Sequence, residues 1–299
     1  MKNRIGLLFN GQGSQCVGMG KRVCELFPFA VEYFTAASDE VGWDVGRLCF
    51  EGPEDELRRT DRCQVALYAV GYVTFCALQA AEMLPPVGAC LGQSLGEWTA
   101  LTAAGAIAYE DGIKFVSLRG KLMDEACRCT PGAMASLLGG TEENAIMLCE
   151  KSGVQLSNFN APDQIVISGE TEKITIAIRL SREFGFRRAI SLSVAGAYHS
   201  RLMQSAQDEL SEEIKKLKIH PPHYAVFSNV TGKLHGNDGD GIRRLLLEQI
   251  TAPVRWSWCM AGAIAMGVQL FYECGPGNVL TNLCRKNAPM AKIFQPNGY

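Results

Sequence analysis

The sequence predicts an α/β protein in which a small subdomain is inserted into a larger one. Apolar runs alternate with segments of helical period over most of the 299 residues, which is typical of α/β construction. Between residues 131 and 197 the pattern changes to strand, helix, strand, strand, helix, strand, the order of a ferredoxin-like subdomain. We therefore expect residues 1–130 and 198–299 to form the large subdomain and residues 131–197 to form the small one.

The elements of the large subdomain follow from apolar runs and the residues that end them. Strands of buried type are expected at 5–9 and 87–92, and amphipathic helices at 61–84 and 109–127. Pro85 and Pro86 end the first of these helices, because proline cannot continue a helix. After the small subdomain the alternation resumes with a helix at 199–217 and strands near 225–228 and 268–273.

The small subdomain is assigned from shorter runs. Its strands are expected at 133–139, 154–160, 164–169 and 187–194, and its helices at 141–152 and 172–185.

Composition excludes several classes of protein. Lys+Arg number 29 against Asp+Glu 31, so the basic excess of a nucleic-acid-binding protein is missing. No apolar run approaches the roughly 18 residues of a membrane helix, and the N-terminus does not resemble a secretory signal, so we expect a cytoplasmic protein. The 12 cysteines contain no C-x-x-C pair, and we expect reduced structural thiols rather than a metal site.

The stretch CLGQSLGEW contains Gly92-x-Ser94-x-Gly96 between an expected strand and an apolar-periodic segment. A nucleophile elbow needs glycines at these positions, because side chains there would clash in the sharp turn. The following helix N-terminus would favour a developing oxyanion, with Leu95 supplying a backbone N–H. The alternative is a glycine- and serine-rich turn without chemistry.

A serine nucleophile needs a general base, and the sequence has four histidines. His220, His223 and His235 lie in polar turns or loops, and we expect them at the surface. His199 follows an apolar run and opens the next helix, a junction where α/β folds place functional groups. It is the predicted base for Ser94.

Two further residues are candidates with plain alternatives. Gln12 lies in the glycine turn after the first strand; Cys16 excludes a dinucleotide motif there, and no G-K-[ST] follows. This turn could bring the backbone N–H or the amide of Gln12 toward the serine, or be only a turn. Arg119 lies on the helix at 109–127, where it could be a solvated charge or point inward toward a carboxylate.

An ordered set of motifs resembles one family, the malonyl-CoA:acyl carrier protein transacylases. The motifs are GQGSQ, GQSLGE, LRGKLMDEA, PGAMASLLG, NFNAPDQIVISG, VAGAYHSRLM, FSNVTGK, EQITAPVRW and YECGPGNVLTNL, and they extend from about residue 5 to 285. The same catalytic fold serves as the acyltransferase of polyketide synthases. The resemblance implies an α/β-hydrolase-like large subdomain and a ferredoxin-like small one, in agreement with the periodicity.

The resemblance also implies roles. Ser94 would attack the thioester of malonyl-CoA, His199 would accept its proton, and the backbone N–H groups of Gln12 and Leu95 would form the oxyanion hole. The backbone carbonyl of Gln249 would orient the histidine. Arg119 would pair with the malonyl carboxylate. The phosphopantetheine thiol of holo acyl carrier protein would then collect the malonyl group by a ping-pong route, without metal or redox cofactor, in a monomeric enzyme that binds neither nucleic acid nor membrane.

Three positions depart from the family pattern: Gln93 replaces the usual histidine of the elbow, Asn10 replaces a common proline, and Tyr198 stands where phenylalanine or serine is frequent. Gln93 cannot titrate near neutral pH, so we expect it to hydrogen-bond or pack beside the substrate. Two rival functions are a serine hydrolase or thioesterase acting on acyl carrier protein or CoA thioesters, and a non-catalytic scaffold. The first has no need of Arg119, and the second has no need of Ser94, His199 and Arg119 together.

Overall fold

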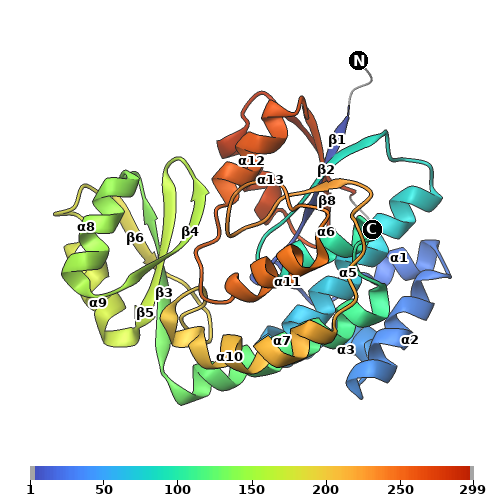
Figure 1. Ribbon diagram of the computed structural model, residues 1–299, viewed down its shortest axis with the longest axis horizontal. Helices are drawn as coiled ribbons and strands as arrows, with labels where there is room; N and C mark the ends of the chain where they lie inside the picture. Colours follow the sequence, from blue (N-terminus) through green and yellow to red (C-terminus); the bar gives the residue numbers. More distant parts are fainter. Residues whose placement is uncertain (1–3, 297–299) are drawn as a thin grey trace.

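The computed structural model describes residues 4–296, and its larger sheet forms the centre of the molecule (Figure 1). The sheet is entirely parallel, with the strand order β7-β2-β1-β8-β9. Its strands are β1 (Ile5–Phe9), β2 (Val87–Gly92), β7 (Ala225–Val226), β8 (Leu270–Cys274) and β9 (Lys292–Phe294). Strand β1 is fully buried and apolar, as is usual for a parallel strand that is covered on both faces.

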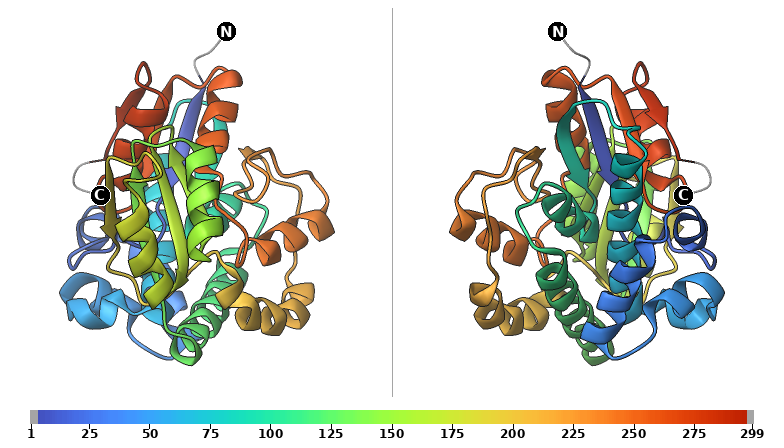
Figure 2. Two further views of the ribbon diagram at one scale, coloured as in Figure 1. Left: turned by 90° about the vertical axis from the view of Figure 1, so that its left-hand side faces the viewer. Right: turned by 90° about the vertical axis from the view of Figure 1, so that its right-hand side faces the viewer.

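Helices cover both faces of this sheet (Figure 2). Leu7 of β1 packs into the cluster that contains α5 and α7, whereas its neighbour Leu8 packs on the opposite face with α12 and α13. The helices of this subdomain are α1 (Lys21–Leu26), α2 (Ala30–Val41), α3 (Val45–Glu51), α4 (Glu54–Arg58), α5 (Thr60–Ala80), α6 (Leu95–Ala103), α7 (Tyr109–Cys129), α10 (Gln204–Glu213), α11 (Gly239–Glu248), α12 (Trp256–Ala265) and α13 (Val279–Asn287).

The smaller sheet lies at the left of Figure 1 and is antiparallel, with the order β4-β5-β3-β6. It consists of β3 (Gly132–Leu138), β4 (Gln155–Ala161), β5 (Gln164–Glu170) and β6 (Arg188–Ser191), with α8 (Glu142–Ser152) and α9 (Thr171–Leu180) packed on it. Its chain order and strand order are those of a ferredoxin-like unit, so the predicted fold class is confirmed. The predicted subdomain boundaries, 130/131 and 197/198, stay a prediction.

Two backbone hydrogen bonds join strand β4 of the small sheet to the large subdomain. The N–H of Val254 donates to the carbonyl of Ser157 at 2.8 Å, and the N–H of Phe159 donates to the carbonyl of Val254 at 2.9 Å. The segment that precedes α12 therefore extends the edge of the small sheet, and it fixes β4 against the large subdomain.

Several elements are shorter than the periodicity predicts. Helix α5 ends at Ala80 instead of 84, where Glu82 adopts a positive φ of 55°. Helix α9 ends at Leu180 instead of 185, because a turn closed by Gly185 follows. The segment 199–217 is not one helix: 3₁₀ turns at 201–203 and 214–216 flank α10. Strands β6 and β7 cover only 188–191 and 225–226 of their predicted ranges.

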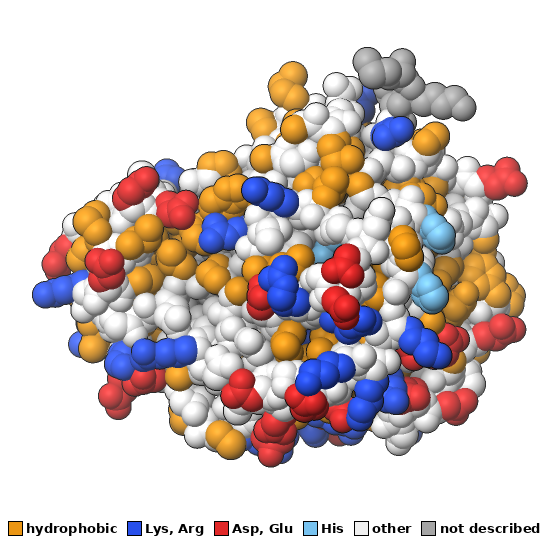
Figure 3. Space-filling view, in the orientation of Figure 1, with side chains coloured by type: hydrophobic (Ala, Val, Ile, Leu, Met, Phe, Trp, Pro, Cys, Tyr) orange, Lys and Arg blue, Asp and Glu red, His pale blue; other side chains and the backbone are white. Residues whose placement is uncertain are grey.

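Two features of the composition can be compared with the structure. By length and apolar content α5 could cross a membrane, contrary to our expectation, but 78% of its apolar window is buried inside the fold. All twelve cysteines are free, and within residues 4–296 no three His, Cys, Asp or Glu side chains are placed to hold a metal ion. On the face shown in Figure 3, acidic and basic side chains are interspersed.

Candidate active site

Ser94 occupies the sharp turn between β2 and α6, with φ 53° and ψ −106°. This backbone conformation is rare for a residue with a side chain and is held by its neighbours. A Cβ on Gly92 would lie 1.9 Å from the backbone of Gly96, and a Cβ on Gly96 would lie 2.0 Å from the carbonyl oxygen of Phe9. Both glycines are therefore required by the close approach of turn, helix and first strand.

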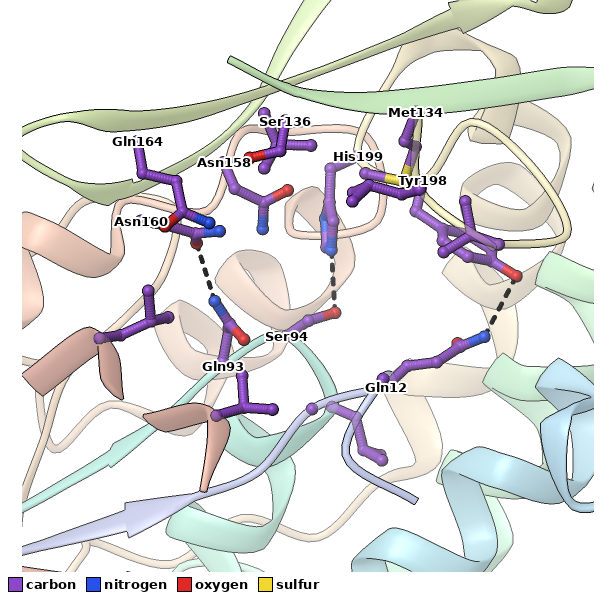
Figure 4. Close-up of a pocket in the computed structure, with 18 of the residues that line it drawn as sticks. Gln12, Gln93, Ser94, Met134, Ser136, Asn158, Asn160, Gln164, Tyr198 and His199 are labelled. Carbon is purple, nitrogen blue, oxygen red and sulfur yellow. Dashed lines mark hydrogen bonds between the residues drawn. The ribbon is translucent and has the colours of Figure 1, made fainter. Parts of the chain in front are cut away.

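His199 faces the serine (Figure 4). Its Nε2 lies 2.9 Å from Ser94 Oγ, and its Nδ1 lies 2.8 Å from the backbone oxygen of Gln249. Because a carbonyl only accepts, Nδ1 carries the proton and Nε2 is free to accept from the serine. Burial lowers the pKa of His199 to about 4, and the charge of Arg119 acts in the same direction. The imidazole is therefore in its base form at neutral pH.

Arg119 of α7 points inward and is only 1% exposed. One terminal nitrogen donates to Ser94 Oγ at 3.0 Å and to Gln249 Oε1 at 3.1 Å, and the other donates to Gln64. Its Nε–H has no acceptor among the described residues. Burial lowers the pKa of Arg119 to about 10, and the carboxylate of Glu97 opposes the shift. A charged guanidinium thus lies beside the serine, and its Nε–H donor is not used by the described residues.

The other predicted site residues meet at the same place. The backbone N–H groups of Gln12 and Leu95 have no acceptor among residues 4–296, and both residues line the cavity at Ser94. The side-chain amide of Gln12 is turned toward Thr60 and Tyr198, with long contacts of 3.4 and 3.5 Å. The sequence allowed either the backbone N–H or the side-chain amide of Gln12 to face the serine. The geometry therefore favours the backbone N–H.

A cavity of about 660 Å³ opens above Ser94, between the large sheet and the small one. Figure 4 shows polar side chains of the small sheet on its far wall, namely Ser136, Asn158, Asn160 and Gln164. Gln93 reaches across, and its Nε2 donates to Asn160 Oδ1 at 2.8 Å. The residue before the nucleophile thus links the elbow to the opposite wall.

Residues 7–287 match the family of acyl transferase domains. The chain belongs to this family. It is 38% identical to the malonyl CoA-acyl carrier protein transacylase of Bacillus subtilis over 289 residues, which cover 95% of this chain and 90% of the relative. It is 39% identical to the polyketide biosynthesis protein ThaF of Burkholderia thailandensis, but it spans only 24% of that longer protein.

Solved structures of this acyl transferase family share the whole fold. The malonyl-CoA:acyl carrier protein transacylase of Xanthomonas oryzae pv. oryzae has a TM-score of 0.94 and 36% identity, covering 100% of this chain and 97% of that one. A malonyl-transacylase in complex with a type II polyketide synthase acyl-carrier protein has a TM-score of 0.93 and 34% identity, covering 98% and 96%.

Sequence reasoning missed the buried groups behind the elbow of this acyl transferase. His235 was expected at the surface, and this is wrong: its side chain is buried, and its Nε2 lies 2.7 Å from Glu97 Oε1. Its polar, glycine-rich surroundings, KLHGNDGDG, are typical of a loop. The stretch is a loop up to Asp238, where α11 follows, but the ring is directed into the core. Asn229 was also missed. The only signal was Glu97 itself, an acid in the first turn of a helix that is otherwise largely apolar.

The contact of Gln93 with Asn160 gives a first prediction. We expect Gln93→His to lower kcat/KM for malonyl-CoA by no more than about tenfold, because an imidazole can still donate one hydrogen bond to Asn160. Gln93→Ala, which removes the contact, is the matched variant and should lose more. A loss of several orders of magnitude in Gln93→His would show that Gln93 takes part in the proton transfer itself.

Proposed function

We propose that this protein transfers the malonyl group of malonyl-CoA to the phosphopantetheine thiol of holo acyl carrier protein, through a malonyl ester on Ser94. The observation that supports this most strongly is the placement of a buried, charged Arg119 3.0 Å from the Oγ of a serine that also contacts His199. A carboxylate on the acyl group is the partner that such a guanidinium needs.

The first half-reaction forms the ester. Ser94 Oγ attacks the thioester carbonyl carbon while its proton passes to His199 Nε2. The backbone N–H groups of Gln12 and Leu95 stabilise the charge that develops on the carbonyl oxygen. When the carbon–sulfur bond breaks, His199 returns the proton to the departing CoA thiolate. In the second half the carrier thiol gives its proton to His199 and its sulfur attacks the ester carbon. When the carbon–oxygen bond breaks, His199 returns the proton to Ser94 Oγ, which restores the free enzyme.

The ring of the general base His199 is oriented by a backbone carbonyl and not by a carboxylate. Nδ1 of His199 donates to the backbone oxygen of Gln249, which fixes the tautomer and the ring orientation. In the free site Arg119 donates to Ser94 Oγ, so the hydroxyl hydrogen is left to point at Nε2. This arrangement prepares the serine to lose its proton in the required direction.

The partners follow from the reaction. CoA and an acidic carrier protein are the expected binding partners, and the relative that is solved with a carrier protein supports the second of these. The pathway is the synthesis of fatty acids or of polyketides, since both kinds of relative match. We propose a monomer that acts in the cytoplasm; one relative, from mouse, is named as mitochondrial.

Adduct formation tests the function. Malonyl-CoA should add one malonyl group to the protein, seen by intact mass spectrometry and located on Ser94 by peptide mapping, and holo carrier protein should remove it. Apo carrier protein, which lacks the thiol, is the matched control. If water removed the group faster than holo carrier protein did, the protein would be a hydrolase and the proposal would fail.

The low pKa of His199 predicts the acid limit of activity. Because the free enzyme's base sets kcat/KM, we expect this value to stay level from pH 7 to about 5 and to fall by half near pH 4. The same shift removes stability as the pH falls from about 6.5 toward 4, because only the unfolded chain takes up the proton there. Circular dichroism at each pH separates the two effects. An inflection near pH 6.5 in folded protein would contradict the buried base.

A further inference from the structure

A carboxylate that the proposed mechanism does not use lies behind the elbow. Glu97 is in the first turn of α6, three residues after Ser94, and is fully buried. His235, far along the chain, pairs with it: Nε2 lies 2.7 Å from Glu97 Oε1, and both side chains are completely excluded from solvent. A buried charge of this kind is costly unless its hydrogen bonds are complete.

Three donors converge on Glu97. Besides His235, the backbone N–H of Asn229 and the side-chain amide of Gln249 each lie 2.8 Å from Oε2. Three hydrogen bonds to two oxygens suit a carboxylate, which only accepts. Glu97 does not line the cavity, so it cannot touch a substrate there.

Both of the other residues held by Glu97 reach the reacting groups. Asn229 accepts from the backbone N–H of Ser94 at 2.6 Å, and its amide donates to the carbonyl of Gly92 at 2.8 Å. Through these two bonds Asn229 links Gly92, at the end of β2, to Ser94, the residue with the rare backbone conformation. One contact with Glu97 thus sets the turn that presents the nucleophile.

Gln249 connects the same carboxylate to the base and to the guanidinium. Its amide nitrogen donates to Ser94 O at 3.1 Å as well as to Glu97, its amide oxygen accepts from Arg119 at 3.1 Å, and its backbone oxygen accepts from His199. With its side chain fixed at both ends, the backbone carbonyl that orients the imidazole is fixed as well.

We propose that Glu97, completed by His235, is the positioning residue of this active site, which holds Ser94 through Asn229 and His199 through Gln249. Glu97 therefore acts indirectly, through Asn229 and Gln249, on the two residues between which the proton is transferred. Displacement of either by about 1 Å is enough to cost on the order of a hundredfold in rate. The proposal rests on the proposed function only in taking Ser94 as the nucleophile.

The test uses a fluorophosphonate probe, which labels an activated serine and needs no malonyl group. We expect Glu97→Ala to slow labelling of Ser94 by about 100-fold, and to lower kcat for malonyl transfer in parallel with little change in KM. Glu97→Gln should stay within about tenfold of the parent rate, because its amide oxygen still accepts from Asn229 and Gln249. Failure of malonyl transfer in the parent protein would refute the proposed function but leave the labelling comparison valid.

Controls separate positioning from stability. Leu101 lies one turn further along the same helix and is equally buried. The Leu101→Ala variant loses core packing, yet its Ser94 should be labelled at the parent rate at temperatures well below its melting temperature. If Glu97→Ala does not fold, Glu97→Asp keeps the charge but withdraws the oxygens, and it should label at least about tenfold more slowly. Folded Glu97→Ala or Glu97→Asp protein that labels as fast as Leu101→Ala, or a loss confined to KM, would overturn the proposal.

Discussion

Ser94→Ala is expected to abolish the malonyl adduct and to reduce malonyl transfer to carrier protein by roughly 10⁴-fold or more, the scale seen when a serine nucleophile is removed. The hydroxyl is the group that forms the ester, and nothing else at the site can replace it in the same position. Intact mass spectrometry after incubation with malonyl-CoA measures the adduct, and a carrier-protein assay measures transfer.

The substitution should leave the fold intact, which makes the result readable. Alanine adopts the same positive φ at about the same cost as serine, and Gly92 and Gly96 still shape the turn. Arg119 loses one acceptor but keeps Gln64 and Gln249. His199→Ala is the companion variant: it should slow adduct formation strongly without preventing it. A malonyl ester that still formed on Ser94→Ala protein would show that another residue is the nucleophile.

The parts of this site that the sequence predicts are those set by local geometry. Gly92 and Gly96 flank Ser94 within five residues, so the elbow could be inferred from spacing and confirmed by the contacts that a Cβ would make. The fold class was equally accessible, because hydrophobic period distinguishes the parallel sheet from the inserted unit. The ends of individual helices were harder to predict, because the single turns at Glu82 and Gly185 decide where α5 and α9 end.

Long-range burial could not be predicted. His235 and Glu97 are 138 positions apart and meet only because β7 pairs with β2, which brings the loop after β7 over α6. Likewise, an arginine on an amphipathic helix is usually solvated, and only the packing of α7 against α5 places Arg119 beside Gln64 and Ser94. The resemblance to a family assigned Arg119 its role; the structure supplies the physical reason, a buried charge with an unused Nε–H.

That unused donor leads to the second large effect. We expect Arg119→Ala to lower malonyl transfer about 10- to 150-fold more than acetyl transfer, which corresponds to the 1.5–3 kcal/mol of a charged hydrogen-bonded pair. Both reactions should also lose rate together, because Arg119 orients Ser94 and Gln249 in the free site. The selectivity is therefore measured as the ratio of single-turnover acylation rates with malonyl-CoA and acetyl-CoA, in which the shared loss cancels.

Two variants decide whether charge or space is responsible. Met123 lies one helical turn beyond Arg119 and lines the same cavity. Met123→Ala therefore enlarges the site without removing a charge, and it should change the acylation rates with malonyl-CoA and acetyl-CoA alike. Arg119→Lys keeps the charge but not the planar fork, and should retain only part of the selectivity. Because Arg119→Ala removes a buried positive charge that interacts with Glu97, melting temperatures are compared first. Equal losses for the two acyl groups in folded Arg119→Ala protein would mean that the guanidinium positions the serine but does not recognise the malonyl carboxylate.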